Sequence, residues 1–252
     1  TSAILAGTGA WGACSSLARN DVEPAGTPVS KALTPPDDEK LSEAVRDALS
    51  AIDTVHGDGS LPEIPVEPKP SGIEGYYKFE IRTREPLRIE LRKNQPAPAF
   101  HLVHEVGHFL DHQVLGMRGR FESESDEHGK LAELFKRIDE SDVIKRMRKL
   151  QGQDYFFIKN QRGRREQRKV PKQVLKYLLE PAEIFARAYA QYTSVRSANP
   201  RLLVEFGATR AAAEEIQCYW SDADFAGIAA AFDDLLESLG WIRKRQTGTE
   251  AS

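Results

Sequence analysis

Apolar residues recur at helical spacing in two segments of the N-terminal half of the chain. The first segment follows Thr34-Pro35-Pro36 and three acidic residues, a combination that favours the start of a helix. The pattern predicts one helix that ends near Gly57 and a second, at least partly buried helix from Ala99 to Leu115. The apolar positions are Leu41, Ala44, Val45, Leu49 and Ile52 in the first segment, and Phe100, Val103, Val106, Phe109 and Leu110 in the second.

Helical spacing also marks the C-terminal half. It predicts helices around residues 131–138 and 143–150, and a helical region at 174–192 in which Pro181 starts a fresh helix or kinks the existing one. A last helical region, 211–241, carries an amphipathic stripe from Phe225 to Leu239 that we interpret as core.

Alternation of apolar and polar residues predicts strands in two places. Residues 77–81 and 87–91 alternate on either side of Glu85-Pro86, which indicates a hairpin of two half-buried strands. Residues 155–169 are typical of a strand, a basic loop with Gly163 at the turn, and a returning strand.

Two segments have no sustained period. Residues 1–33 are rich in Gly, Ala, Ser and Thr and predict a flexible N-terminal arm. Four prolines between Gly59 and Gly75 predict an extended connector rather than a packed element. We therefore expect an α+β fold with an arm (1–33), a helix with its Pro-rich connector (34–75) and a mostly helical main domain (76–245), whose small twisted sheet packs on the helix at 99–115.

Composition narrows the function classes without naming one. The formal net charge of −3 gives no global attraction to nucleic acid or to an anionic membrane, and no run of 18 apolar residues predicts a membrane-spanning helix. With only Cys14 and Cys218, we expect two unpaired thiols and exclude a cysteine zinc site. The N-terminus has no clear signal peptide, so we expect a disordered or trimmed start; the missing initiating Met also allows that the chain is a fragment of a longer protein.

The strongest chemical signal is the run His-Glu-Val-Gly-His at residues 104–108. Two histidines four residues apart on a helix point their imidazoles to the same side, as a catalytic zinc ion requires. Glu105 is then carried beside the open coordination position, where it can act as general base on zinc-bound water. We therefore predict Zn²⁺ as cofactor, with His104 and His108 as ligands.

The third ligand has to come from elsewhere in the chain. Six residues past the second histidine, where a compact zinc motif has a ligand, this chain has Val114. Asp111, three residues past His108, is interpreted as a residue that orients an imidazole. His101 and His112 extend the same helical stripe, and we interpret both as rim or surface residues.

The best distant carboxylate lies in the segment 180–190, whose small alanines allow close packing against the helix that carries the histidines. A glutamate in the first turn of this helix can reach the metal. We choose Glu183 as the third ligand and keep Glu180 as the alternative.

At this point the chain resembles known families. Residues 104–111 (His-Glu-Val-Gly-His-Phe-Leu-Asp) together with 183–189 (Glu-Ile-Phe-Ala-Arg-Ala-Tyr) resemble the paired gluzincin motifs of the anthrax lethal factor protease domain and the Pro-Pro endopeptidases. The second motif with Trp220–Phe225 is also similar to zincin-like domains of phage and mobile-element polyvalent proteins. The resemblance covers roughly residues 76 to 240. It implies a zincin-like fold, a metallopeptidase activity and Glu183 as the third zinc ligand.

The chain departs from this pattern at one catalytic position. The secreted proteases have a tyrosine seven residues before the ligand glutamate that steadies the tetrahedral intermediate, whereas Lys176 stands at that spacing here. Tyr177 lies one residue later, and we predict that it takes the catalytic role, with an ordinary core aromatic as the alternative.

A basic run between Lys159 and Lys172 is the one local concentration of charge, and we interpret it as a solvated hairpin. The leading hypothesis is an endopeptidase acting on a peptide or protein, either in the cytoplasm or delivered as an effector. The alternative is a phage- or mobile-element-associated accessory protein that binds nucleic acid or capsid on the same scaffold, for which contacts of the basic run with phosphate would be needed.

Overall fold

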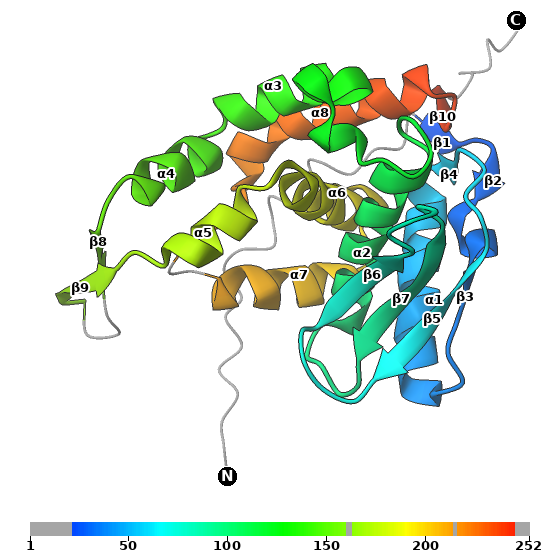
Figure 1. The fold of residues 1–252 in the computed structure, drawn as a ribbon, viewed down its shortest axis with the longest axis horizontal. Coiled ribbons are helices and arrows are strands. Elements are labelled where there is room, and N and C mark those ends of the chain that lie inside the picture. Colours follow the sequence, from blue (N-terminus) through cyan, green and yellow to red (C-terminus); the bar gives the residue numbers. More distant parts are fainter. Residues whose placement is uncertain (1–21, 160–162, 214–215, 245–252) are drawn as a thin grey trace, which may run out of the picture.

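Helix α2 (Pro98–Gln113) contacts the main sheet and several other helices (Figure 1). The computed structural model describes residues 22–159, 163–213 and 216–244. The helices are α1 (Glu39–Val55), α2 (Pro98–Gln113), α3 (Ala132–Glu140), α4 (Asp142–Gln151), α5 (Lys172–Leu178), α6 (Pro181–Ser197), α7 (Pro200–Ala212) and α8 (Asp222–Ser238), with the 3-10 helices η2 (Val29–Ala32), η3 (Glu122–Glu124) and η4 (Asp126–Leu131). The strands are β1 (Val22–Pro24), β2 (Thr27–Pro28), β3 (Leu33–Thr34), β4 (Gly57–Asp58), β5 (Ile64–Lys69), β6 (Gly75–Phe79), β7 (Pro86–Arg92), β8 (Tyr155–Lys159), β9 (Arg165–Lys169) and β10 (Ile242–Lys244). The α+β prediction is confirmed.

Most predicted helices are present near their expected bounds. Helix α1 begins after Asp38, whose carboxylate accepts the N–H of Leu41 at 3.1 Å and so caps the first turn. At Pro181 the chain starts a fresh helix rather than a kinked one. The stripe of α8 is core as predicted, but the helix begins only at Asp222, and residues 216–221 are not helical, so the expected region 211–241 was too long.

The main sheet has the strand order β3-β5-β7-β6. Strands β3, β5 and β7 run parallel, and β6 returns antiparallel to β7, which confirms the predicted hairpin. Strand β6 therefore lies at one edge of the sheet, and both β6 and β7 contact α2.

The Pro-rich connector prediction is wrong for residues 64–69, because they form the interior strand β5. Ile64 and Val66 are buried and alternate with exposed Pro65 and Glu67, a strand pattern that the prolines masked. The first two residues of β5 pair with β3 and the remaining four with β7, so no residue is paired on both sides. A proline, which lacks an N–H, is tolerated in such a position.

The arm prediction also fails for residues 22–33, while residues 1–21 lie outside the described part of the chain. Strand β1 pairs with β10, near the other end of the described chain, and β2 pairs with β4. In η2, Val29 and Ala32 are buried against α1. Burial of these few apolar residues offsets the poor helix and strand propensity of the segment.

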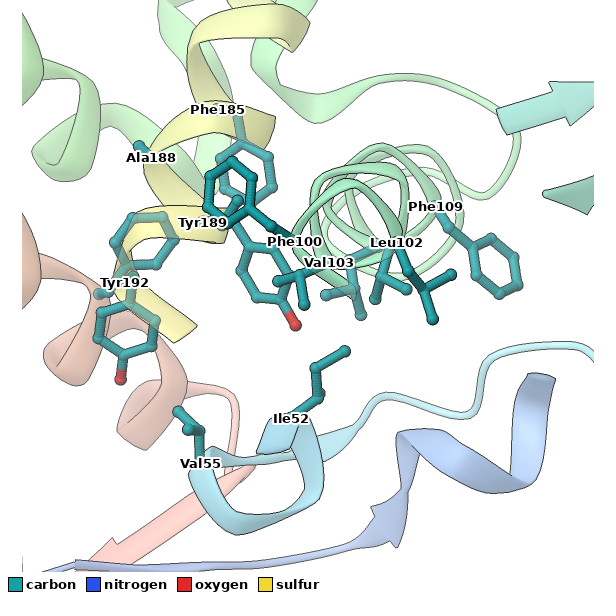
Figure 2. Packing of buried hydrophobic residues seen from close by; sticks show 14 of the residues in the cluster. Ile52, Val55, Phe100, Leu102, Val103, Phe109, Phe185, Ala188, Tyr189 and Tyr192 are labelled. Carbon is teal, nitrogen blue, oxygen red and sulfur yellow. The ribbon is translucent and has the colours of Figure 1, made fainter. Parts of the chain in front are cut away.

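The core is centred on the packing of α1, α2 and α6, and Figure 2 shows their side chains filling the space between the three helices. Ile52 of α1 and Val103 of α2 face Tyr189 of α6 there. The Tyr189 hydroxyl lies 2.8 Å from Nε2 of buried His56, which ties α6 to the end of α1. The N-terminal helix and the main sheet therefore belong to the same core as α2.

In the part of the chain that the structure describes, none of the helices has the length and apolar character needed to cross a membrane.

Candidate metal centre

Helix α2 presents His104 and His108 toward α6. Pro98 occupies its first turn, and because Ala97 has no side chain that can cap, the N–H of Phe100 donates instead to the Glu205 carboxylate of α7 at 2.9 Å. The spacing of four residues then places both imidazoles on one face, as predicted. Their rings lie 4.9 Å apart between centroids.

Glu183 meets both imidazoles from the first turn of α6. His104 Nε2 lies 3.4 Å from Glu183 Oε1, and His108 Nε2 lies 3.5 Å from Oε2. One ligand atom from each of the three residues falls within 4.8 Å of the others, so the group can hold a metal ion. Glu180, the alternative, is the N-cap residue of α6, is exposed, and is not part of this group.

The charge of Glu183 is stabilised within the protein. Burial raises the pKa of its carboxyl, but the charges and hydrogen bonds of His104 and His108 outweigh burial and hold the pKa well below its usual range. One turn along α6, Arg187 Nε lies 3.9 Å from Glu183 Oε1. The Arg187 guanidinium donates to the carbonyls of Leu178 and Cys218, so it is fixed behind the glutamate.

The Glu105 side chain extends from α2 to the edge strand β6. It is only 6% exposed, and its Oε2 accepts the N–H of Tyr77 at 2.8 Å. At Gly75, two residues earlier in β6, an added Cβ would lie 2.6 Å from Glu105 Oε1. The absence of a side chain at residue 75 therefore leaves room for the carboxylate.

Tyr177, near the end of α5, reaches the same cluster. Its hydroxyl donates to Glu183 Oε2 at 2.6 Å, although the residue as a whole is 52% exposed. Burial of the hydroxyl end and the charge of Glu183 raise the pKa of the Tyr177 phenol above its ordinary range. The hydroxyl therefore stays protonated and remains a donor at neutral pH. Tyr177 thus reaches the candidate metal ligands although it lies six residues before Glu183, and not seven as in the secreted proteases.

Asp111 of α2 is fully buried, and its side chain is held by Ser123 of η3. Its Oδ1 accepts the Ser123 N–H at 2.9 Å and its Oδ2 accepts the Ser123 hydroxyl at 2.5 Å. Burial raises the pKa of Asp111 to about 6, against the lowering effect of these hydrogen bonds. Asp111 thus anchors the segment after α2, and its influence on an imidazole stays a prediction.

The two other histidines of the stripe differ in their surroundings. His101 lines a cleft that opens over the cluster, and its Nδ1 lies 2.7 Å from Gln95 Oε1, as expected for a rim residue. For His112 the rim interpretation is wrong, because the residue is 1% exposed and its Nδ1 lies 2.9 Å from the Tyr77 hydroxyl. Strand β6 covers this end of α2, which the helical pattern alone did not indicate.

A cleft of about 760 Å³ opens over the cluster. Its lining includes the three metal-binding candidates with Glu105 and Tyr177, and residues 73–77 at the start of β6 form one wall. Residues of α7 and the aromatic ring of Tyr219 also contribute to the lining. The cleft therefore gives a ligand access to the candidate metal centre and to an edge strand together.

Sequence reasoning missed three contributors to this centre: Gly75, the backbone N–H of Tyr77, and Arg187. A lone glycine at the start of a strand pattern is a signal of close approach by another group, so Gly75 could have been noticed. The other two contacts depend on how β6 and α6 pack on α2, which no local pattern encodes.

Comparisons of this chain with protein-family models, with curated proteins and with solved structures found no match.

Proposed function

We propose that the chain is a zinc-dependent endopeptidase of the gluzincin type, with a zincin-like fold. The single observation that carries the proposal is the convergence of two imidazoles from α2 and one carboxylate from α6 within 4.8 Å, in the lining of a cleft. In the proposal His104, His108 and Glu183 are the zinc ligands, and Glu105 is the general base.

The chemistry of the donor set fits zinc. Two histidine nitrogens and one carboxylate oxygen are a frequent ligand set of catalytic zinc, with a further position open to water or substrate. Glu183 is 5% exposed, and a buried carboxylate beside two imidazoles is stabilised by a cation at their meeting point. Zinc bound there would act as a Lewis acid on the scissile carbonyl and would lower the pKa of a water ligand.

Glu105 is suited to move the proton in this reaction. The hydrogen bond from Tyr77 fixes the orientation of its carboxylate, and burial excludes most competing water. In the proposal Glu105 takes a proton from the attacking water and passes it to the departing amine, so that the amine leaves in a neutral form.

Tyr177 is proposed to donate a hydrogen bond to the oxygen of the attacked carbonyl as negative charge develops on it. The hydroxyl is a protonated donor and already lies within the cluster. During turnover the O–H of Tyr177 would then be shared between Glu183 and the substrate oxygen.

The substrate is proposed to be an extended peptide that pairs with strand β6. An edge strand has one row of backbone groups that its sheet leaves unpaired, and adding a peptide strand is a common mode of recognition. In β6 the N–H of Tyr77 on this row already donates to Glu105, so a peptide would pair with the other backbone groups of the edge. Residues 73–77 form a wall of the cleft, so a peptide paired with them would pass over His104 and Glu105. Such pairing positions the scissile bond by its backbone, which suits an endopeptidase.

The test combines metal analysis with cleavage of a peptide library by the wild type and by Glu105→Gln. We expect bound zinc in both proteins and cleavage by the wild type alone, because the amide cannot serve as a base. Cleavage retained in Glu105→Gln, or a wild type that neither holds zinc nor cleaves any member of the library, would remove the proposal.

A further inference from the structure

The β8–β9 hairpin stands apart from the body of the protein. It connects α4 to α5, and Figure 1 shows it extending away from the helices at the side opposite the main sheet. The two strands pair antiparallel in the register Tyr155↔Lys169 to Lys159↔Arg165. This element has no part in the proposed peptidase chemistry, so its surface needs a separate account.

One face of the hairpin combines aromatic rings with polar and basic side chains. In an antiparallel pair, opposed residues and those two positions along share a face. Tyr155 and Phe157 therefore lie on the same face as Arg165, Gln167 and Lys169. The two rings are 56% and 54% exposed, so both are accessible to a ligand on the same face as the basic side chains. The sequence order, with the aromatics ahead of the basic run, hid this interleaving.

Arg165 is stacked on one of these rings. Its guanidinium carbon lies 3.8 Å from the centroid of the Phe157 ring. A guanidinium held in this way presents a flat, positively charged surface on which a further planar group can stack. The arrangement is less suited to insertion into lipid, because a charged group covers the apolar ring.

The hairpin is also an island of positive charge. The hairpin, residues 155–169, contains six lysines and arginines and a single glutamate, whereas the whole chain has a formal net charge of −3. That glutamate, Glu166, pairs with Arg168 on the other face. Within the described chain, no carboxylate forms an ion pair with Arg165 or Lys169. The hairpin therefore attracts a polyanion, whereas the rest of the chain carries a net negative charge.

We propose that the exposed face of the β8–β9 hairpin binds single-stranded nucleic acid. Bases stack on Tyr155 and on the Arg165–Phe157 pair, and Lys169 contacts phosphate. Stacking on aromatic side chains beside basic groups is the common mode for single strands, whose bases are free, whereas a duplex keeps its bases stacked inside. The proposal goes beyond the peptidase activity and does not depend on it.

The experiment measures fluorescence anisotropy of a labelled single-stranded oligonucleotide of mixed sequence, as DNA and as RNA, with the full chain over a range of salt concentrations. We expect binding that weakens with salt. Tyr155→Leu and Phe157→Leu keep apolar bulk but remove the ring, and each is expected to weaken binding at least about fivefold. The double variant Arg165→Gln/Lys169→Gln is expected to bind more weakly and to have a smaller salt dependence.

The matched control is Lys136→Gln/Arg137→Gln on α3, which removes the same charge from another exposed site and is expected to leave binding unchanged. Circular dichroism of every variant checks that the fold is kept. The proposal is overturned by the absence of binding, by leucine variants that bind like the wild type, or by an equal loss in the control. It is also overturned if a DNA duplex or an anionic phospholipid vesicle binds more tightly through the same residues.

Discussion

At the scale of single residues, Glu105 depends on a neighbour that has no side chain. A Cβ at Gly75 would lie 2.6 Å from Glu105 Oε1, well inside van der Waals contact. Gly75 is not among the glycines with positive φ, so the requirement is for space and not for an unusual backbone conformation. Other residues fit the backbone at this position, but they exclude the carboxylate.

Gly75→Ala is therefore expected to lower peptide cleavage by about 100-fold, because a displacement of the base by a fraction of an ångström or more disrupts proton transfer. Zinc content should stay at the wild-type level, since position 75 contacts Glu105 and not the ligands. Steady-state kinetics with zinc analysis measures both. Gly227→Ala, where an added Cβ meets nothing within 4 Å, is the control. Full activity in Gly75→Ala would contradict this account of Glu105.

Removal of the Tyr177 hydroxyl distinguishes a catalytic role of this group from a role in holding Glu183. If it stabilises the developing oxyanion, Tyr177→Phe lowers kcat by about 100- to 1000-fold, with zinc affinity close to that of the wild type. If it only holds Glu183, zinc affinity falls and kcat at saturating zinc is unchanged. We predict the first outcome, measured by kinetics at several zinc concentrations.

Buried His56 makes the stability of the fold sensitive to acid. Burial lowers its pKa from 6.5 to about 4, so the unfolded chain takes up a proton on this residue at a higher pH than the folded chain does. Its contribution to stability is complete above pH 6.5 and is lost as the pH falls toward 4. From pH 7 to pH 5 the loss is about 2 kcal/mol.

Urea unfolding at pH 7 and pH 5 tests this expectation. A chelator is added so that metal binding does not contribute to the unfolding free energy. His56→Gln cannot take up the proton, and its unfolding free energy should fall by about 2 kcal/mol less than that of the wild type over the same interval. His101 and His112, whose pKa values burial also lowers to about 4, give both proteins the same background slope. Equal losses in the two proteins would show that His56 is not the cause.

At the scale of elements, the close approach of α2 and α6 brings the ligands together. A Cβ at Gly107, between the two histidines, would lie 3.0 Å from the Ala186 Cα and 3.1 Å from Tyr189 Cδ1. The Ala186 contact is backbone in a buried helix, so it has little freedom to move. Gly107 of α2 and Ala186 of α6 therefore form one close packing contact between the two helices.

Gly107→Ala is expected to destabilise the protein by about 1 kcal/mol, because overpacking costs about 1–3 kcal/mol while the gain in helix propensity is at most about 1 kcal/mol. The zinc affinity should fall as well, since α6 carries Glu183. Gly227→Ala, in open space on α8, has only the propensity gain and is expected to stabilise. Thermal unfolding of the two variants compares the signs, and a shift in the same direction for both would refute the packing argument.

The sequence predicts elements well where periodicity is strong and poorly where pairing decides. Helices α1, α2 and α8 have clear apolar stripes, and α1 also has its capping aspartate. The prolines of strand β5 favour a connector, but each residue of this strand pairs on one side only, and such pairing tolerates proline. Helix α7 was not predicted, yet its Glu205 caps the helix that bears the histidines. Both errors concern contacts between segments that are distant in sequence.

At the scale of the whole molecule, the candidate centre joins the two halves of the chain. The motif at residues 104–108 could be predicted because a spacing of four fixes the geometry within one helix. The choice of Glu183 over Glu180 needed the orientation of α6 on α2, and a sequence pattern could only offer both. Residues 116–175, which lie between the motifs, hold α3, α4 and the β8–β9 hairpin, and none of these elements enters the metal group. Helices α3 and α4 contribute buried residues to the core.

The most direct test of the central claim is the zinc content of the purified protein after dialysis, for the wild type, Glu183→Gln and Glu180→Gln. The wild type and Glu180→Gln are expected to hold about one zinc ion per chain, and Glu183→Gln is expected to lose it, because a neutral amide is a much weaker ligand. A wild type without zinc, or zinc that is lost in Glu180→Gln and kept in Glu183→Gln, would contradict the assignment of His104, His108 and Glu183 as the metal centre.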